Sequence, residues 1–224
     1  MPLNLPGPIL YLITRGATTE ATTPDSSEFR DILVQISSAV DAGIDLIQVR
    51  EKNLTARVLF ELVFRAVEIT LGTSTRLLVN DRADIAAGAG ADGVHLTTQS
   101  IDAATIRKTF GKEFLIGAST HSLAEAIAAR DSDADFVVFG PIYKTKSKEQ
   151  YGSPLGLSKL SEVTRALGGF PVLALGGISA DNARDCLNAG AAGIAGISLF
   201  SVPENLSRVV NLLKKSAKEL GDDK

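Results

Sequence analysis

The segment "GPIYKTKSKEQYGSPLG", from Gly140 to Gly156, concentrates side chains that can bind an anion. Its residues 144–148 supply three ammonium groups and two hydroxyls, although the whole chain has a net charge of −3. Ammonium groups act as point charges toward phosphate oxygens, and hydroxyls can donate further hydrogen bonds. The segment therefore raises the question of which anion it holds.

A second set of cations follows an apolar run and ends in "QVREK". In an extended chain Gln48, Arg50 and Lys52 face one side, because side chains alternate. The arginine fork and the lysine charge would clamp a diphosphate. The alternative is a solvated strand end, paired with Glu51 or Asp45. We favour the clamp, because cations gather at the ends of several apolar runs.

The tripeptide "NDR" follows the next apolar run, and it has two interpretations. Asp81 could bind Mg²⁺, which takes few protein carboxylates when substrate phosphates supply other ligands, and Asn80 could donate to a phosphate. Alternatively, both residues could begin the helix that "ADIAAG" predicts, because Asn and Asp are good N-caps. The residues alone leave both interpretations open.

Two late apolar runs end in small residues, "ALGGI" and "GIS". Paired glycines let backbone amides approach a ligand, so Gly176, Gly177, Ile197 and Ser198 would surround one phosphate. The alternative is a tight turn with left-handed glycines.

Two histidines and one cysteine complete the candidate reactive groups. His121, in "STH", could be a general acid or base or a hydrogen-bonded structural residue, and both interpretations stay open. His95 follows an apolar run, and we expect a structural role for it. Cys186 lies in "DNARDCLNAG", where we expect it to pack in a helix. As a lone cysteine it can form no internal disulfide.

Composition narrows the class of protein. Apolar residues make up 45% of the 224 residues and charged residues 22%, which is typical of a globular chain with a sizeable core. The mild acidity argues against nucleic acid as a partner. No run of about 18 apolar residues and no signal-peptide pattern occur, so we expect a cytoplasmic protein without a membrane span.

Short apolar runs alternate with helical patterns along the chain. Runs this continuous are typical of parallel strands buried on both faces. We expect them at 9–15, 44–52, 76–82, 92–96, 114–120, 135–141, 171–177 and 193–198. Small residues precede several of them, in "DAGIDLI", "GAGADGV", "DSDADFV" and "NAGAAGI".

Eight strands alternating with helices predict a single α/β domain, a (β/α)₈ TIM barrel over 1–224 with its core at about 9–215. A doubly wound open sheet is the alternative, but its glycine-rich turn is missing. We expect loose segments at 16–27 and 144–156. In such a barrel the carboxyl ends of the strands form the active site, so the donors above would bind a polyanionic small molecule, bridged by one metal ion.

The ordered motifs resemble those of the thiamin phosphate synthase/TenI superfamily, over roughly residues 10–200. They are "QVREK", "VNDRADIA", "ADGVHL", "GASTH", "FGPIYKTKSK", "GL", "PVLALGGI" and "GAAGIAGIS". The resemblance implies a TIM-barrel transferase of thiamine biosynthesis. Such enzymes join hydroxymethylpyrimidine diphosphate to thiazole phosphate and release pyrophosphate, with Mg²⁺ as cofactor. It implies small phosphorylated partners, in keeping with the absence of nucleic-acid and membrane partners expected from the composition; a homo-oligomer stays open.

The resemblance also implies a role for each matching residue. Asp81 resembles a Mg²⁺ ligand, Ser119 a pyrimidine contact, and Lys148 the lysine that meets the leaving pyrophosphate. The diphosphate set would be Gln48, Arg50, Lys52 and Asn80; Thr145 and Ser147 would bind the thiazole carboxylate and pyrophosphate; Gly177, Ile197 and Ser198 would bind the thiazole phosphate. The roles of Lys144 and Lys146 stay open.

One departure weakens the synthase assignment. The position of a second Mg²⁺ carboxylate in synthases falls on Ser100, while nearby Asp102 is expected to cap a helix. The TenI branch includes thiazole tautomerases, in which a histidine placed like His121 is the acid/base group. We rank the synthase first and the tautomerase second. A non-catalytic protein that binds thiamine precursors, or a sugar-phosphate epimerase or isomerase, are further alternatives.

Overall fold

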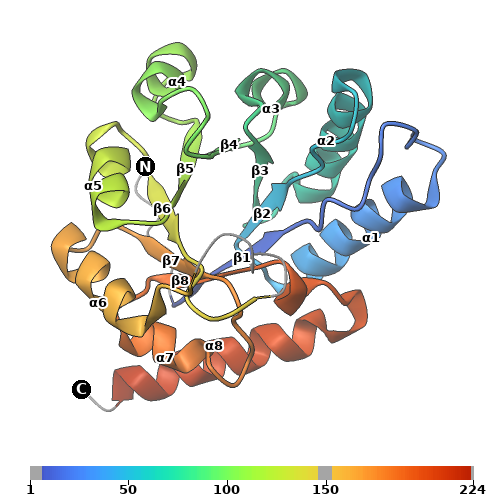
Figure 1. Cartoon of the computed structure of the whole chain (residues 1–224). Coiled ribbons are helices and arrows are strands. Elements are labelled where there is room, and N and C mark those ends of the chain that lie inside the picture. The colour runs from blue at the N-terminus through green and yellow to red at the C-terminus, as the bar shows by residue number, and fades with distance from the viewer. Residues whose placement is uncertain (1–6, 146–152, 223–224) are drawn as a thin grey trace.

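The computed structural model describes residues 7–145 and 153–222. Strands and helices alternate along this chain (Figure 1). The strands are β1 (Ile9–Ile13), β2 (Leu46–Val49), β3 (Arg76–Asn80), β4 (Gly93–Leu96), β5 (Leu115–Thr120), β6 (Phe136–Phe139), β7 (Val172–Leu175) and β8 (Gly193–Gly196). The helices are α1 (Ser27–Ala42), α2 (Ala56–Thr70), α3 (Ala83–Ala89), α4 (Ala103–Phe110), α5 (Leu123–Asp131), α6 (Gly156–Leu167), α7 (Ala183–Asn188), two 3₁₀ turns, η2 (Ser198–Phe200) and η3 (Pro203–Asn205), and α8 (Leu206–Asp222).

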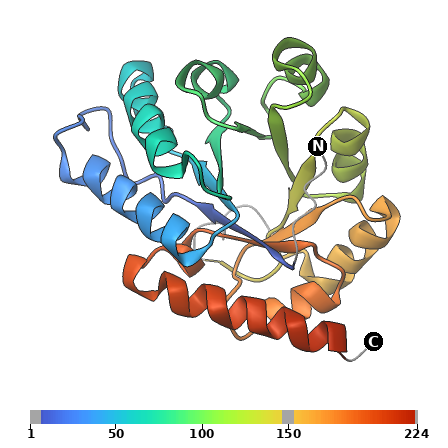
Figure 2. The same cartoon turned by 180° about the vertical axis from the view of Figure 1, so that it is seen from behind.

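The strands form a closed parallel barrel in chain order, β1 to β8, and β8 pairs with β1. Helices surround the ring on its outside, as both cartoon views show (Figure 2). This confirms the predicted (β/α)₈ barrel. Among the helices described, none is long and apolar enough to cross a bilayer.

Alternation along each strand divides the apolar residues into two cores. One core lies inside the barrel and includes Tyr11, Leu78, Phe136 and Leu173, all buried. The larger core lies between the strands and the helices, where the other strand positions pack against residues such as Phe29 of α1. Both strand faces are thus covered, which explains why the runs are apolar almost throughout.

The strands end earlier than the apolar runs suggest. The run at 44–52 is a strand only over Leu46–Val49, so Arg50 and Lys52 lie just beyond its carboxyl end. Segment 16–27, expected to be loose, is fixed at its start. The Glu51 carboxylate accepts hydrogen bonds from Gly16 N (3.0 Å), Thr18 N (3.2 Å) and Thr18 Oγ1 (2.8 Å). That expectation was therefore wrong for residues 16–18.

Three aspartates explain the phrase that recurs before the strands. Asp45, Asp92 and Asp135 directly precede β2, β4 and β6. Each carboxylate accepts a hydrogen bond from a backbone N–H on the previous strand, and the donors are Leu10 (2.8 Å), Leu77 (2.8 Å) and Ile116 (2.7 Å). The same aspartates donate their own N–H groups back to those three residues' carbonyls. We call each such reciprocal pair an aspartate clamp.

The aspartate clamp at Asp135 also includes an ion pair that is largely shielded from solvent. It therefore gives a stability prediction. Its Oδ2 also accepts a hydrogen bond from Arg107 Nη2 at 2.7 Å, and the two side chains are only 16% and 14% exposed. Asp135→Ala leaves the Ile116 N–H and the Arg107 guanidinium without this partner. We expect a loss of about 2–4 kcal/mol in the free energy of unfolding, measured by urea titration.

Asp131→Ala is the matched control, because Asp131 pairs with Arg130 on the surface and is 58% exposed. Surface pairs contribute about 0–1 kcal/mol. Equal losses in the two variants would contradict a special role for the clamp.

Candidate active site

The carboxyl ends of the strands meet at one end of the barrel, which we call the mouth. The structure places most predicted site residues at or just beyond these ends. The last residues of β2, β3 and β5 include Gln48, Asn80 and Ser119. Beyond the strand ends lie Arg50 and Lys52 after β2, Asp81 after β3, His121 after β5, Thr145 after β6, Gly177 after β7, and Ile197 and Ser198 after β8. The predicted Ser147 and Lys148 lie outside the described residues.

Arg50 brings a cation to the mouth. Its backbone N–H donates to Thr14 Oγ1 at 2.8 Å, which ties the end of β2 to β1. Its guanidinium is close enough to His95 to lower the pKa of that imidazole. The suggested pairing with Glu51 or Asp45 does not form, because those carboxylates bind backbone N–H groups. Within residues 7–145 and 153–222 no ion pair to Arg50 occurs.

Gln48 and Asn80 lie side by side on neighbouring strands beneath this cation. Gln48 is buried, and its Nε2 donates to Asn80 Oδ1 at 3.5 Å. The contact orients the Asn80 amide so that its NH₂ group remains a donor. Lys52 is exposed in the turn after β2.

Asp81 occupies a strained turn at the end of β3. Its φ is 62°, in the left-handed region, and Arg82 N donates to Asn80 O at 2.8 Å across it. A three-residue turn of this kind with positive φ is rare and strained, and such strain concentrates at functional sites. Asp81 does not cap α3, because Arg82 stands at the N-cap position and no side chain caps the helix. The helix-cap interpretation of "NDR" is therefore wrong.

Ser100 and Asp102, which follow β4, both make hydrogen bonds to neighbouring residues of the chain. Ser100 Oγ accepts a hydrogen bond from Thr97 N at 2.8 Å and so closes a small turn. Asp102 caps α4 as expected, since its oxygens bond Thr105 N (2.8 Å) and Thr105 Oγ1 (2.9 Å). No cluster of three metal-ligating side chains occurs in the described part of the chain. A cation here would have Asp81 and substrate oxygens as ligands, which is a donor set that suits Mg²⁺.

Three rings fill the barrel below the mouth. Tyr11, His95 and Phe136 have ring centroids 5.6–6.0 Å apart. Tyr11 Oη lies 3.2 Å from His95 Nδ1, and His95 Nε2 lies 2.9 Å from Ser119 Oγ. Gly117 makes room for them, because a Cβ there would lie 2.7 Å from His95 Nδ1. His95 is 2% exposed and both of its ring nitrogens have hydrogen-bond partners, which agrees with the structural role expected for it.

Tyr11 belongs to the site's environment but was missed by the sequence analysis. Its available signal was weak: it is the one polar residue among the inward-facing Ile9, Tyr11 and Ile13 of β1. Burial raises its pKa well above the ordinary value, so the phenol keeps its proton.

His121 is held at the rim by two neighbours. Its Nδ1 donates to the Gly140 carbonyl at 2.6 Å, and its backbone N–H donates to Glu125 Oε2 at 2.7 Å. Ser122 caps α5, because its hydroxyl accepts a hydrogen bond from Glu125 N. With Nδ1 protonated, the neutral ring keeps its lone pair on Nε2.

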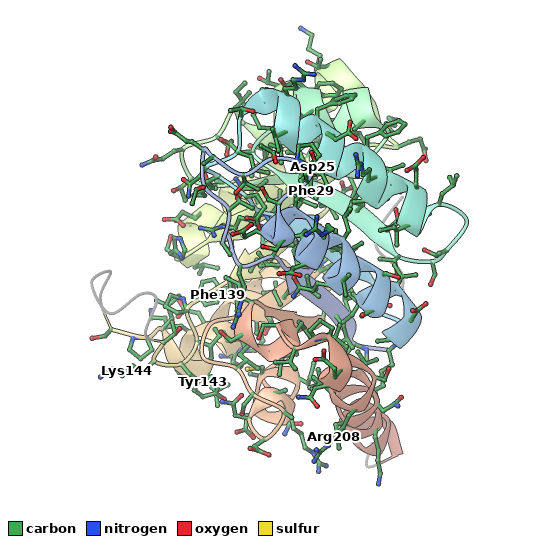
Figure 3. All side chains as sticks on the ribbon, turned by 90° about the vertical axis from the view of Figure 1, so that its right-hand side faces the viewer. Asp25, Phe29, Phe139, Tyr143, Lys144 and Arg208 are labelled. Carbon is green, nitrogen blue, oxygen red and sulfur yellow. The ribbon has the colours of Figure 1, made fainter. Side chains whose placement is uncertain are left out.

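The lysine-rich segment is anchored beside β7 at both of its described ends. Ile142 N donates to Leu175 O and Tyr143 N to Gly176 O, both at 2.9 Å. Leu155 N and Gly156 N return to Pro141 O (2.8 Å) and Ile142 O (3.1 Å). Figure 3 shows Lys144 beyond Tyr143 at the edge of the molecule.

The two glycines after β7 allow residues 141–144 to pack closely against the end of this strand. Gly176 and Gly177 have φ of 102° and 65°. A Cβ on Gly177 would lie 2.6 Å from Lys144 O. The turn interpretation of the pair is thus confirmed, and it leaves phosphate binding by Gly177 as a separate prediction.

Ile197 and Cys186 both pack against apolar residues. Ile197 packs against the inner core directly before Ser198, which begins η2. Cys186 is buried, and burial raises the pKa of its thiol to about 11, so the expected packing role is confirmed.

Comparisons with known proteins agree with this geometry. The family model described as thiamine monophosphate synthase matches residues 11–200. The chain is 44% identical over 185 residues to a Geobacter sulfurreducens protein whose name refers to thiamine-phosphate synthase, covering 82% of this chain and 86% of that protein. It is 37% identical to the thiamine-phosphate synthase of Chlorobium phaeobacteroides, covering 79% and 87% of the two chains.

Two solved structures share the barrel fold with this chain. The thiamine phosphate pyrophosphorylase of Pyrococcus furiosus superposes with a TM-score of 0.78 and 29% identity, over 94% of this chain and 96% of that one. A 3-hexulose-6-phosphate synthase superposes with a TM-score of 0.65 over 92% of this chain and 99% of that one, at 14% identity, and shares the fold alone.

The buried His95 predicts a specific dependence of stability on pH. Burial, together with Arg50, lowers its pKa from 6.5 to about 3. Below pH 6.5 the unfolded chain therefore binds a proton that the folded chain does not bind. We expect His95 to reduce the free energy of unfolding by about 1.4 kcal/mol per pH unit as the pH falls from 6.5 toward 3.

Urea titrations of the wild type and His95→Gln at several pH values between 6.5 and 4 would measure this contribution. Other titrating groups act in both proteins, so the difference between the two profiles belongs to position 95. Parallel profiles would mean that His95 is protonated in the folded state.

Proposed function

Because the chain belongs to the thiamine monophosphate synthase family, we propose that it is a transferase that joins hydroxymethylpyrimidine diphosphate to thiazole phosphate and releases pyrophosphate. The observation that carries the proposal is Arg50, an unpaired cation among the described residues, held at the mouth beside the donors of Gln48 and Asn80. A diphosphate is the substrate group that such a forked donor set fits.

Bond breaking at the pyrimidine methyl group leaves negative charge on the departing pyrophosphate. Arg50 and Lys148 would stabilise that charge, and fixed donors are most effective where charge develops in the transition state. The barrel would position the thiazole nitrogen against the pyrimidine methyl carbon and exclude water. Ser119 would contact the pyrimidine, and no proton transfer is required for this step.

Asp81 is the residue that we propose holds Mg²⁺. A magnesium ion supplies charge neutralisation on the diphosphate when it is bound. With Ser100 and Asp102 engaged in their own loop, the remaining ligands would come from the substrate and water.

The second substrate would lie toward the last strands. Gly177, Ile197 and Ser198 follow β7 and β8, which are hydrogen-bonded neighbours, and loops at this position commonly bind a phosphate. Thr145 and Ser147 would meet the thiazole carboxylate and the pyrophosphate. Lys52 would add charge from the β2 side.

One observation favours a second candidate function, isomerisation of the thiazole phosphate carboxylate. The Gly140 carbonyl accepts a hydrogen bond from His121 Nδ1, so in the neutral tautomer Nε2 carries the lone pair that a general base uses. The same phosphate site would serve this reaction.

A turnover assay distinguishes the two reactions. Purified protein with hydroxymethylpyrimidine diphosphate, thiazole phosphate and Mg²⁺ is expected to yield thiamine phosphate, followed by fluorescence after oxidation. Arg50→Ala and Lys148→Ala should each lower kcat/KM by about 100-fold or more, because each removes charge stabilisation worth roughly 3 kcal/mol. Lys112→Ala is the control, since Lys112 is exposed in the loop that enters β5 at the opposite end of the barrel.

Absence of product at concentrations where both substrates bind would contradict the synthase proposal. Isomerisation of the thiazole phosphate carboxylate that is lost in His121→Gln would then establish the second function.

Metal binding gives a test that does not depend on turnover. With Mn²⁺ as a spectroscopic probe, we expect binding to be at least about tenfold tighter in the presence of pyrophosphate than without it, because the protein offers one carboxylate. Asp81→Asn should remove this gain, since asparagine tolerates positive φ but lacks the charge. Asp84→Asn, at a surface pair with Arg82, is the control. Tight Mn²⁺ binding without pyrophosphate would contradict a metal site completed by substrate.

A further inference from the structure

We propose that Tyr11 and His95 are positioning residues that fix the polarity of the Ser119 hydroxyl, so that it donates a hydrogen bond to an acceptor atom of the substrate at the mouth. The identity of that acceptor, a pyrimidine ring nitrogen, rests on the proposed function. The polarity itself rests on the contacts of three side chains.

The chain of hydrogen bonds begins at a phenol with one partner. Tyr11 is fully buried in the barrel, and in the described part of the chain the one hydrogen-bond partner of its hydroxyl is His95 Nδ1, at 3.2 Å. The Tyr11 ring lies in the inner apolar core, with an edge-to-face contact to Phe136. A buried hydroxyl proton without an acceptor is costly, so Tyr11 donates its proton to Nδ1.

The second link follows from the tautomers of imidazole. A neutral ring that accepts at Nδ1 carries its proton on Nε2. That nitrogen lies 2.9 Å from Ser119 Oγ and so donates to it. His95 is 2% exposed and its ring lies against the rings of Tyr11 and Phe136, and burial among such neighbours favours the neutral imidazole.

The third link leaves Ser119 as an outward donor. Its oxygen already accepts from His95, so its own proton must point to another acceptor. Ser119 is the penultimate residue of β5, half-buried, and on the strand face that points into the barrel above Gly117. No described protein group accepts this proton, and the mouth is the side on which a substrate would lie.

The reverse direction is disfavoured by the same contacts. If Ser119 donated to Nε2, His95 would donate from Nδ1 to Tyr11, and the phenolic proton would have no acceptor inside the barrel. The His95 and Phe136 rings pack directly against Gly117, because any side chain at this position would displace one of them. A site whose donor direction is fixed before binding loses no free energy in reorienting it.

Nitrogen-15 NMR of the imidazole rings measures the tautomer directly, in the full-length protein without substrate. The chain has two histidines, so His121→Gln assigns both sets of signals. We expect His95 to show a protonated Nε2 and an unprotonated Nδ1. Tyr11→Phe should convert it to a mixture or to the Nδ1–H form. Tyr143→Phe is the matched control, because the Tyr143 hydroxyl contacts Asn182 O at 3.4 Å, away from this chain of bonds.

Kinetics separate positioning from stability. Tyr11→Phe is expected to lower kcat about tenfold in the wild-type background and less than about twofold in Ser119→Ala, because the effect of Tyr11 passes through Ser119. A merely structural effect of Tyr11→Phe would lower both backgrounds equally.

An Nδ1–H tautomer in the wild type, or a Tyr11→Phe effect of equal size in both backgrounds, would overturn the proposal. If the protein shows no synthase turnover, the NMR outcome still decides the polarity of Ser119, so failure of the proposed function is recognised separately.

Discussion

A closed ring of eight parallel strands must fill its own centre, and the floor of the mouth depends on how it does so. Here the filling is a triangle of rings, Tyr11, His95 and Phe136. It fits only because Gly117 contributes no Cβ. Packing in a barrel interior is as dense as in a crystal, so a polar ring among apolar ones must find its hydrogen bonds within the filling. The apolar core and the polar mouth are therefore joined at one histidine.

The architecture could be predicted because the barrel imposes burial on both faces of every strand. Each apolar run of the sequence corresponds to one strand, from Ile9–Ile13 to Gly193–Gly196. The ends of the strands could not be predicted as well, because the apolar residues continue past the last hydrogen bond between neighbouring strands. Segment 16–18 was misjudged for a similar reason. Its polar residues suggest a free loop, while the acceptor that fixes them, Glu51, is more than 30 residues away in the chain.

The site was predictable where position follows from topology alone. Knowing that strand ends converge was enough to bring Gln48, Asn80 and Ser119 to one mouth. Side-chain partners were harder to foresee, because they depend on distances that no spacing encodes. Asp102 could have been a ligand or a cap, and its two bonds to Thr105 decide for the cap. Tyr11 gave almost no signal, since its hydrogen bond is made to His95, a residue 84 positions away in the chain that it meets inside the barrel.

The aspartate clamps divide the barrel unevenly. They fasten β1 to β2, β3 to β4, and β5 to β6, but the corresponding residue before β8 is Ala192, which offers only its backbone N–H to Val172 O at 2.8 Å. The quarter of the ring formed by β7 and β8 is thus the least fastened at its base, and local opening should concentrate there. A ligand that bridges the upper ends of these two strands would bind only the closed form, so its binding energy would hold the ring shut. Occupancy and closure of the barrel then become two measures of one equilibrium.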